Sequence, residues 1–243
     1  MPRRAEGADN GMETRENGGI IIPGGGSGRE RRVGRKIFLG ALGLGALGVA
    51  SNNLFSAPLT GLKTATEPSG VIPGFTVYRV APDPVFDPRT WRLTVGGLVD
   101  HKLSLSYHEL LNLPPLDVTR DYQCVTGWKV PLVRWEGVSL QTLARVAGAR
   151  AGATFINFYC ADGVYSESLR LPGQAFKPDV MLGYKLNGRP LVREQGAPLR
   201  LVVPEMYGYK YAKWVNRVEF STHQEIGYWE QNGYTVDAYL GTE

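Results

Sequence analysis

The sequence predicts an α+β fold dominated by β-sheet, and two observations carry this prediction. Short runs of alternating apolar residues, rich in branched and aromatic side chains, recur through residues 75–243 and end at Gly, Pro or Asp. That pattern is typical of half-buried strands. Helix-capping residues followed by apolar side chains at helical spacing stand out at two places in the same stretch. Many short strands with a few short helices indicate a mixed, sheet-rich fold.

In chain order, the first expected strand is residues 91–95, where apolar and polar residues alternate. A Ser-x-x-Glu capping box then opens a helix over residues 106–111, and the proline pair after it stops the helix. Ser139 caps a second helix whose leucines share one apolar face. Gly148 ends this helix, because glycine readily adopts the left-handed backbone of a C-cap.

Four further strands are expected, at residues 155–159, 168–171, 199–203 and 215–220. Asn187-Gly188, between two apolar triplets, predicts a tight hairpin because both residues tolerate the positive φ of a two-residue turn. No Gly-x-Gly-x-x-Gly sequence opens a helix after a strand, which argues against a nucleotide-binding Rossmann unit.

The N-terminal part of the chain differs in composition from the rest. Residues 1–36 hold eight of the 27 basic and five of the 23 acidic side chains, with almost no apolar pattern. We therefore expect a disordered basic tail there, because such a stretch buries too little surface to become ordered. The remaining chain is close to neutral, which argues against a nucleic-acid-binding domain.

Residues 37–55 are expected to form an export signal or a membrane anchor, so that the protein works outside the cytoplasm. The uncharged run at residues 37–50 would be about 21 Å long as a helix, shorter than the ~30 Å hydrocarbon core of a membrane. It follows a basic cluster ending in Arg35-Lys36 and resembles a twin-arginine export signal. Residues 56–74 are then expected to be a linker, and residues 75–243 the functional domain.

Cys124 is the first candidate for chemistry. It ends an extended segment, and Arg120 and Lys129 stand near it, so positive charge is expected to favour a thiolate that acts as nucleophile or metal ligand. A buried, inert cysteine is the alternative. The two cysteines and three histidines show no zinc-ligand spacing, and no histidine is placed to serve as a base for Cys124.

Several separated blocks occur in the order typical of one family. They are Tyr78-Arg79, residues 91–97, residues 105–114, Gln123-Cys124-Val125-x-Gly127-Trp128, and residues 135–140, 196–204 and 207–214. Over residues 75–235 the chain therefore resembles the molybdopterin-binding domain of the sulfite oxidase family, which includes periplasmic methionine-sulfoxide reductase catalytic subunits.

The resemblance implies the fold of that domain and a Mo-molybdopterin cofactor, with Cys124 as the protein ligand of the metal. A soft thiolate suits molybdenum. The cofactor would carry a two-electron oxygen-atom transfer, while the protein binds, orients and shields it. A lone cysteine without a neighbouring base is what such a site requires.

The resemblance also implies which residues hold the cofactor: Tyr78, Arg79, Cys124, Cys160, Gln195, Arg200, Tyr211, Ala212 and Lys213. Arg200 and Lys213 would bind the phosphate of the pterin, the first as a bidentate group and the second as a point charge. Gln195 stands where relatives carry Asn or His, and Cys160 where they often carry Ser or Thr. Without the resemblance, Arg200 would be read as an outward-facing strand residue and Cys160 as a core residue.

Two residues are expected to face the substrate. Arg79 takes the place of an arginine near the metal of sulfite oxidases and suits an anionic substrate, whereas the methionine-sulfoxide reductases carry an acidic residue in a similar stretch. Tyr234 resembles a sulfite oxidase tyrosine that points toward the metal. The alternative is that Tyr234 only packs with Tyr228 and Trp229 over the sheet.

The sequence thus predicts a sulfite oxidase-like enzyme that transfers oxygen atoms to or from a small molecule outside the cytoplasmic membrane. Two alternatives stay open. One is a reductase of methionine sulfoxide or other S-oxides fed by a membrane haem partner, and the other is a metal-free binding or scaffold module on the same fold. Since no haem-binding domain precedes residue 75, electrons are expected to pass through a membrane haem protein or a soluble cytochrome.

Overall fold

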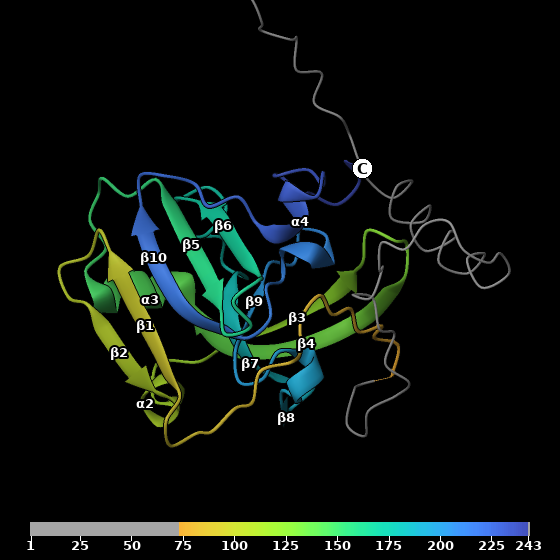
Figure 1. The fold of residues 1–243 in the computed structure, drawn as a ribbon, viewed down its shortest axis with the longest axis horizontal. Coiled ribbons are helices and arrows are strands. Elements are labelled where there is room, and N and C mark those ends of the chain that lie inside the picture. The colour runs from red at the N-terminus through yellow and green to blue at the C-terminus, as the bar shows by residue number, and fades with distance from the viewer. Residues whose placement is uncertain (1–72, 243) are drawn as a thin grey trace, which may run out of the picture. The chain divides into compact units, whose positions relative to one another are not determined.

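The computed structural model describes residues 73–242, which form two five-stranded sheets (Figure 1). The first sheet has the order β2-β1-β10-β5-β6, with β1 Arg92–Gly97, β2 Leu103–Ser106, β5 Phe155–Cys160, β6 Ser166–Arg170 and β10 Val215–Ser221. The second has the order β3-β4-β7-β8, and β9 also pairs with β7; its strands are β3 Leu116–Gln123, β4 Lys129–Ser139, β7 Met181–Leu186, β8 Arg189–Pro190 and β9 Arg200–Val202. Within these sheets only β1 and β10 pair in parallel.

The helical elements of this range are short: α2 Tyr107–Leu111, α3 Leu140–Ala147, α4 Tyr228–Gln231, and the 3-10 turns η1 Arg193–Gln195 and η2 Gly208–Lys210. The two expected helices are confirmed together with their caps. The Glu109 amide donates to the hydroxyl of Ser106, and the Ser106 amide donates to the Glu109 carboxylate at 2.8 Å. Ser139 caps α3, which ends at Gly148 with φ of +65°.

The expected strands all form, as β1, β5, β6, β9 and β10, so the sheet-rich α+β prediction is confirmed. Asn187-Gly188 closes the β7–β8 hairpin with φ values of +48° and +78°. The Asn187 side chain also accepts the Arg134 amide of β4 at 2.9 Å, which ties the hairpin to the neighbouring strand.

The long curved hairpin of β3 and β4 was not predicted as a pair of strands (Figure 1). Its ladder is irregular, because the register shifts between Arg120 and Tyr122 and β4 contains Pro131. At this place the Asp121 carboxylate accepts the Leu132 amide at 3.0 Å. A side chain therefore replaces the missing ladder bond, and local pattern does not reveal such a replacement.

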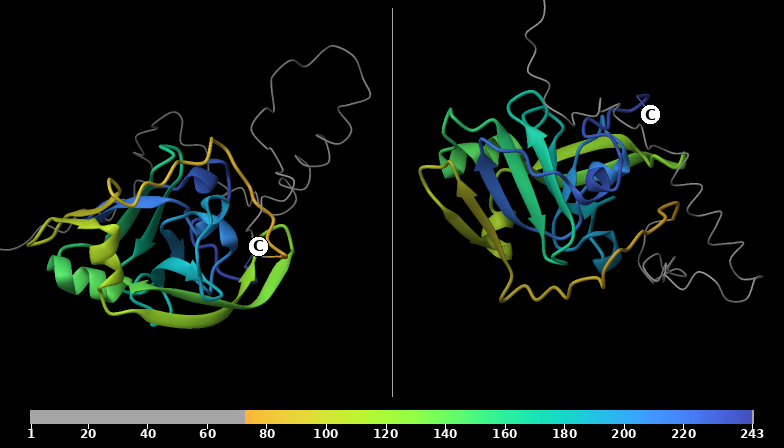
Figure 2. Two further views of the ribbon diagram at one scale, coloured as in Figure 1. Left: turned by 90° about the horizontal axis from the view of Figure 1, so that it is seen from below. Right: turned by 45° about the horizontal axis from the view of Figure 1, so that its top comes forward.

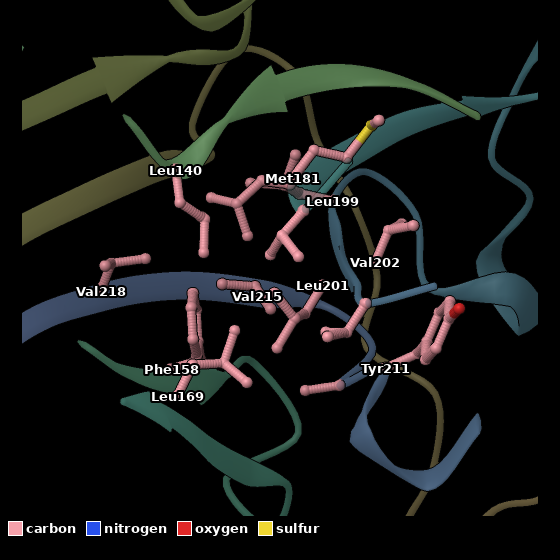
Figure 3. Packing of buried hydrophobic residues seen from close by; sticks show 14 of the residues in the cluster. Leu140, Phe158, Leu169, Met181, Leu199, Leu201, Val202, Tyr211, Val215 and Val218 are labelled. Atoms are coloured by element: carbon pink, nitrogen blue, oxygen red, sulfur yellow. The ribbon is translucent and has the colours of Figure 1, made fainter. Parts of the chain in front are cut away.

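The core brings side chains of the two sheets together (Figure 3). Leu201 of the second sheet lies beside Val215 of the first, with Phe158 close by, and each of these three residues is fully buried. The buried region continues to Tyr211, which also lines the pocket described below. The pocket thus stands on a closely packed base.

Between residues 73 and 242, no helix is long and apolar enough to cross a membrane. The expected tail at residues 1–36, the export signal or anchor at residues 37–55, and nearly all of the linker at residues 56–74 lie outside the described residues.

Candidate functional site

One pocket brings together eight of the ten predicted site residues. Its wall comes from residues 75–78, the turn after β3, η1, β9, η2 and the chain around α4. The eight are Tyr78, Cys124, Gln195, Arg200, Tyr211, Ala212, Lys213 and Tyr234.

Cys124 lies in the turn between β3 and β4, in the pocket wall, with 7% of the residue exposed. Two backbone hydrogen bonds close the turn: the Cys124 amide donates to the Trp128 carbonyl at 3.0 Å, and the Gly127 amide donates to the Cys124 carbonyl at 3.0 Å. The Thr126 hydroxyl donates to Sγ of Cys124 at 3.3 Å. The thiol therefore has a fixed place in the wall, and the backbones of Val125 and Thr126 also donate hydrogen bonds to it.

Burial raises the pKa of the Cys124 thiol, and hydrogen bonds from the Thr126 hydroxyl and from the backbones of Thr126 and Val125 oppose this shift only in part. The expected stabilisation of a thiolate by Arg120 and Lys129 is wrong. Arg120 donates to the Asp179 carboxylate at 3.1 Å, and Lys129 is exposed to solvent. In the ligand-free protein the thiol keeps its proton, so a metal ion would have to displace it on binding.

Arg200 is 4% exposed, so the outward-facing alternative is wrong. Its Nη1 donates to the Gln195 carbonyl at 2.9 Å, and its Nη2 donates to the Tyr211 carbonyl at 3.1 Å. Its Nε is buried and has no hydrogen-bond partner among residues 73–242. Burial lowers the pKa of this guanidinium, but its ordinary value is so high that the group stays charged. Arg200 thus has a fixed direction, and its Nε is a buried donor without an acceptor among these residues.

Lys213 is half-buried next to Arg200. Its Nζ donates to the Tyr78 carbonyl at 2.8 Å and lies 4.0 Å from the centre of the Trp214 ring. Burial and then the charge of Arg200 lower the pKa of this amine to about 7. Gly196 allows the two cations to approach, since at φ of +102° its Cβ would lie 3.1 Å from Cβ of Lys213 and 3.3 Å from Cβ of Arg200.

Gln195 adds a second unused donor to the same wall. It is 3% exposed, and its Nε2 has no hydrogen-bond partner within the described part of the chain. Buried donors are rarely left without an acceptor, and two neighbouring cations in a poorly hydrated wall favour an anion. A ligand with a phosphate, ring acceptors and a metal for Cys124 meets these requirements. The residues present therefore fit a molybdopterin cofactor.

The rest of the wall is largely aromatic, and most of it was not predicted: Phe75, Tyr122, Tyr165, Tyr209 and Trp229. Tyr122 had a signal in the sequence, because it stands two residues before Cys124 in the extended segment that leads to it, and residues at this spacing share a face. Tyr165 follows a turn and Trp229 belongs to a four-residue helix, so no periodic pattern marked them.

Two predicted residues do not line this pocket. Nε of Arg79 donates to both carboxylate oxygens of Asp83 at 2.8 Å. Cys160 lines a separate polar cavity that also contains Tyr159 and Arg217, and burial raises the pKa of its thiol well above the usual range. Among residues 73–242, no group of three His, Cys, Asp or Glu side chains is arranged to hold a metal ion.

The chain is similar to proteins of one family. Residues 80–229 match the family described as oxidoreductase molybdopterin binding domain. The uncharacterized oxidoreductase YuiH of Bacillus subtilis is 35% identical over 166 residues, which cover 68% of this chain and 82% of that protein. A putative protein-methionine-sulfoxide reductase subunit, YedZ1 of Azospira oryzae, is 34% identical over 61% of this chain and 55% of its own length. Human mitochondrial sulfite oxidase is 31% identical over 67% of this chain and 35% of its own length.

A solved structure has a similar fold. The sulfane dehydrogenase SoxCD of Paracoccus pantotrophus matches with a TM-score of 0.56 and 24% identity, over 61% of this chain and 42% of that one. The chain spans most of the Bacillus protein, but about half or less of the other two curated relatives. The family match covers more than half of the chain and includes Cys124, Arg200 and Lys213. The chain therefore belongs to the family of oxidoreductase molybdopterin binding domains.

Proposed function

We propose that this chain is a molybdenum-dependent oxidoreductase that carries out two-electron oxygen-atom transfer with a Mo-molybdopterin cofactor in the pocket around Cys124. One observation carries the proposal: the thiol of Cys124 and the cations of Arg200 and Lys213 line a single pocket. A soft metal ligand beside two phosphate-binding groups is complementary to a metal that carries an anionic organic tail.

In this proposal, Cys124 is the protein ligand of molybdenum. Arg200 and Lys213 bind the pterin phosphate, and the Gln195 amide donates to a ring acceptor. Tyr78, Tyr211 and Ala212 line the same pocket, and the carbonyls of Tyr78 and Tyr211 also hold Lys213 and Arg200 in place. When bound, the cofactor supplies a two-electron redox centre that exchanges one oxygen atom with the substrate.

The substrate that the geometry favours is a neutral S-oxide such as methionine sulfoxide. Arg79, the residue expected to attract an anion, is neutralised by Asp83 and lies outside the pocket wall. The cations in the wall, Arg200 and Lys213, are taken by the cofactor phosphate, and much of the remaining wall is aromatic. The relative described as a putative protein-methionine-sulfoxide reductase subunit agrees with this choice. Sulfite oxidation is the competing direction, since human sulfite oxidase is also a relative.

Tyr234 is the residue that we assign to the substrate side of the pocket. It is 9% exposed and lines the wall. Its ring centre lies 5.7 Å from that of Trp229 and 5.0 Å from that of Tyr209. These rings would bind the apolar part of a sulfoxide substrate, and the phenol of Tyr234 would contact its polar end. We assign Arg79 to the charge balance beside Lys213, since Asp83 raises the pKa of this lysine and Arg79 opposes Asp83.

The reduction of an S-oxide consumes two electrons and two protons and releases water. We propose that a membrane haem protein or a cytochrome delivers the electrons. We further propose that residues 1–36 are a basic tail, residues 37–55 direct export or anchor the protein, and residues 56–74 link them to the enzyme domain. Fractionation of cells that express the full chain or residues 56–243 tests the location, since the truncated protein should stay in the cytoplasm.

The test of the cofactor is an analysis of molybdenum and pterin in the purified protein, in Cys124→Ser and in Cys160→Ser. Cys160 is the matched control, because it is equally buried but lies outside the pocket. We expect stoichiometric metal in the wild type and in Cys160→Ser, and loss of the metal in Cys124→Ser. A wild type without metal and pterin would support a scaffold module instead. Full metal content and turnover in Cys124→Ser would refute the ligand assignment.

The direction of the reaction is tested with the metal-loaded protein. Turnover of methionine sulfoxide with a chemical reductant is compared with turnover of sulfite with a chemical oxidant. The proposal expects a larger kcat/KM for the sulfoxide, and a larger kcat/KM for sulfite would reverse the assignment of substrate.

A further inference from the structure

Three buried charged side chains, Lys210, Glu167 and Glu230, form a cluster next to the pocket. Lys210 is 1% exposed, and the side chains of both glutamates are 2% exposed. Nζ of Lys210 donates to Glu167 and to Oε1 of Glu230, the latter at 2.8 Å, and lies 3.4 Å from the Ser168 carbonyl. None of the three lines the pocket itself. The proposed function therefore does not use them.

Each member of this cluster belongs to a different segment, and each segment supplies one aromatic residue to the pocket wall. The pairs are Lys210 with Tyr209 in η2, Glu230 with Trp229 in α4, and Glu167 of β6 with Tyr165, the residue just before β6. The rings are neighbours, with 6.4 Å between the ring centres of Tyr165 and Trp229. The Tyr234 ring packs against two other rings of the wall, with its centre 5.7 Å from that of Trp229 and 5.0 Å from that of Tyr209. The cluster thus ties together the segments that carry one continuous aromatic wall.

The segment that most depends on this tie is α4. It has four residues, and its N-cap residue Gly227 offers no side-chain hydrogen bond. Helices of this length are not stable on their own, because nucleation costs more than a few hydrogen bonds return. Figures 1 and 2 show α4 near one end of β6. Lys210 connects the two elements, because it pairs with Glu230 of α4 and with Glu167 of β6.

Gly227 shows how closely α4 packs against this tie. A Cβ on residue 227 would lie 2.2 Å from Oε2 of Glu230 and 2.9 Å from the Ser166 carbonyl. The backbone of Gly227, with φ of −64°, is one that alanine adopts without strain. Glycine is therefore needed at position 227 because the Glu230 carboxylate occupies the space of a side chain, and not because of the backbone conformation.

Because of the charges that remain, removal of Glu230 should loosen α4 without unfolding the sheet. Removal of one partner from a buried ion pair is strongly destabilising when the other charge is left alone. Without Glu230, however, Lys210 keeps its pair with Glu167 inside the fold. The loss is then confined to the tether of α4.

We propose that Lys210, Glu167 and Glu230 are positioning residues that hold α4 where Trp229 and Tyr234 complete the substrate side of the pocket. The identity of the bound substrate rests on the proposed function, whereas the role of the cluster in holding α4 does not. Glu230 acts through Trp229 and does not touch the substrate.

The test compares Glu230→Ala, Gly227→Ala and Glu230→Gln in the metal-loaded protein. Glu205→Ala is the matched control, because it removes a Lys–Glu pair at the surface, where Glu205 is 54% exposed. The first readout is hydrogen exchange at the amides that close α4, such as Gln231 to the Gly227 carbonyl at 3.0 Å and Gly233 to the Glu230 carbonyl at 3.0 Å. The second is the separation of KM from kcat for methionine sulfoxide.

In Glu230→Ala and Gly227→Ala we expect faster exchange of these amides and a KM raised about tenfold, with kcat changed by less than about twofold, as for a loss of uniform binding. Glu230→Gln keeps an oxygen acceptor for Lys210 and should restore both readouts. Glu205→Ala should match the wild type. Wild-type exchange and KM in both disruptive variants would overturn the proposal. A fall in kcat and metal content at unchanged KM would also overturn it, because the cluster would then support the fold and not the wall.

Hydrogen exchange requires neither metal nor turnover. A wild-type protein without molybdenum would therefore refute the proposed function, and the exchange comparison would still decide whether the cluster holds α4.

Discussion

The backbone of Gly208 lies against the phenol of Tyr122, so closely that a Cβ on residue 208 would be 2.1 Å from the tyrosine oxygen. The Tyr122 ring also packs edge-on against Tyr211, with 5.0 Å between ring centres, and lies within hydrogen-bonding reach of Arg200. A residue without a side chain therefore makes room for a phenol that supports the guanidinium proposed to bind phosphate.

Gly208→Ala should lower the free energy of unfolding by about 1–3 kcal/mol, the usual cost of overpacking a filled interior. Tyr122 is 7% exposed and cannot turn away without moving its neighbours. Tyr122→Ala removes the group that the new methyl meets, so the double variant should lose less stability than the sum of the single ones. Urea unfolding of the four proteins measures this coupling, and strictly additive losses would contradict the contact.

Arg200→Lys should lose cofactor although it keeps the positive charge. Lysine has no planar fork to reach the carbonyls of Gln195 and Tyr211 while leaving a donor for phosphate. We expect about a tenfold drop in bound pterin, measured by fluorescence after release from the protein. Arg217→Lys, at a half-exposed arginine outside the pocket, is the control and should keep its pterin. Undiminished pterin in Arg200→Lys would remove this residue from the site.

The ligand-free pocket should bind anions in a pH-dependent way, because the pKa of Lys213 is about 7. Above that pH the amine is neutral, and a bound anion favours its charged form, so binding takes up a proton. The affinity for sulfate, which keeps its charge, should be nearly constant below pH 7 and fall by up to about tenfold per pH unit above it. Titration calorimetry across this range checks the profile. Lys213→Met should bind more weakly and without this dependence, and a flat profile in the wild type would show that Lys213 does not meet the anion.

Replacement of both Arg79 and Asp83 by uncharged residues should leave turnover of methionine sulfoxide within about twofold of the wild type. The two side chains neutralise each other outside the pocket wall, so Arg79→Met with Asp83→Asn removes a pair and leaves no unbalanced charge. Steady-state kinetics on the doubly substituted, metal-loaded protein tests this. A tenfold or larger fall in kcat/KM, on the scale of one lost charged contact, would mean that Arg79 enters the substrate site.

Local chemistry explains which parts of the fold were predictable. The Ser106 capping box, the Gly148 C-cap and the Asn187-Gly188 turn each depend on residues that are neighbours in the chain. The β3–β4 hairpin was missed because its ladder is kept by the Asp121 carboxylate across a break in register. No local pattern encodes that contact.

The sequence by itself determined five of the ten strands of residues 73–242, the Asn187-Gly188 hairpin, the helix caps and the order of the blocks that carry Cys124, Arg200 and Lys213, because these depend on residue type and spacing along the chain. Only the tertiary structure decided that Arg200 is buried with a free donor, that Arg79 turns to Asp83, and that Cys160 faces another cavity. The physical reason is that burial and side-chain direction follow from the packing of segments far apart in the chain.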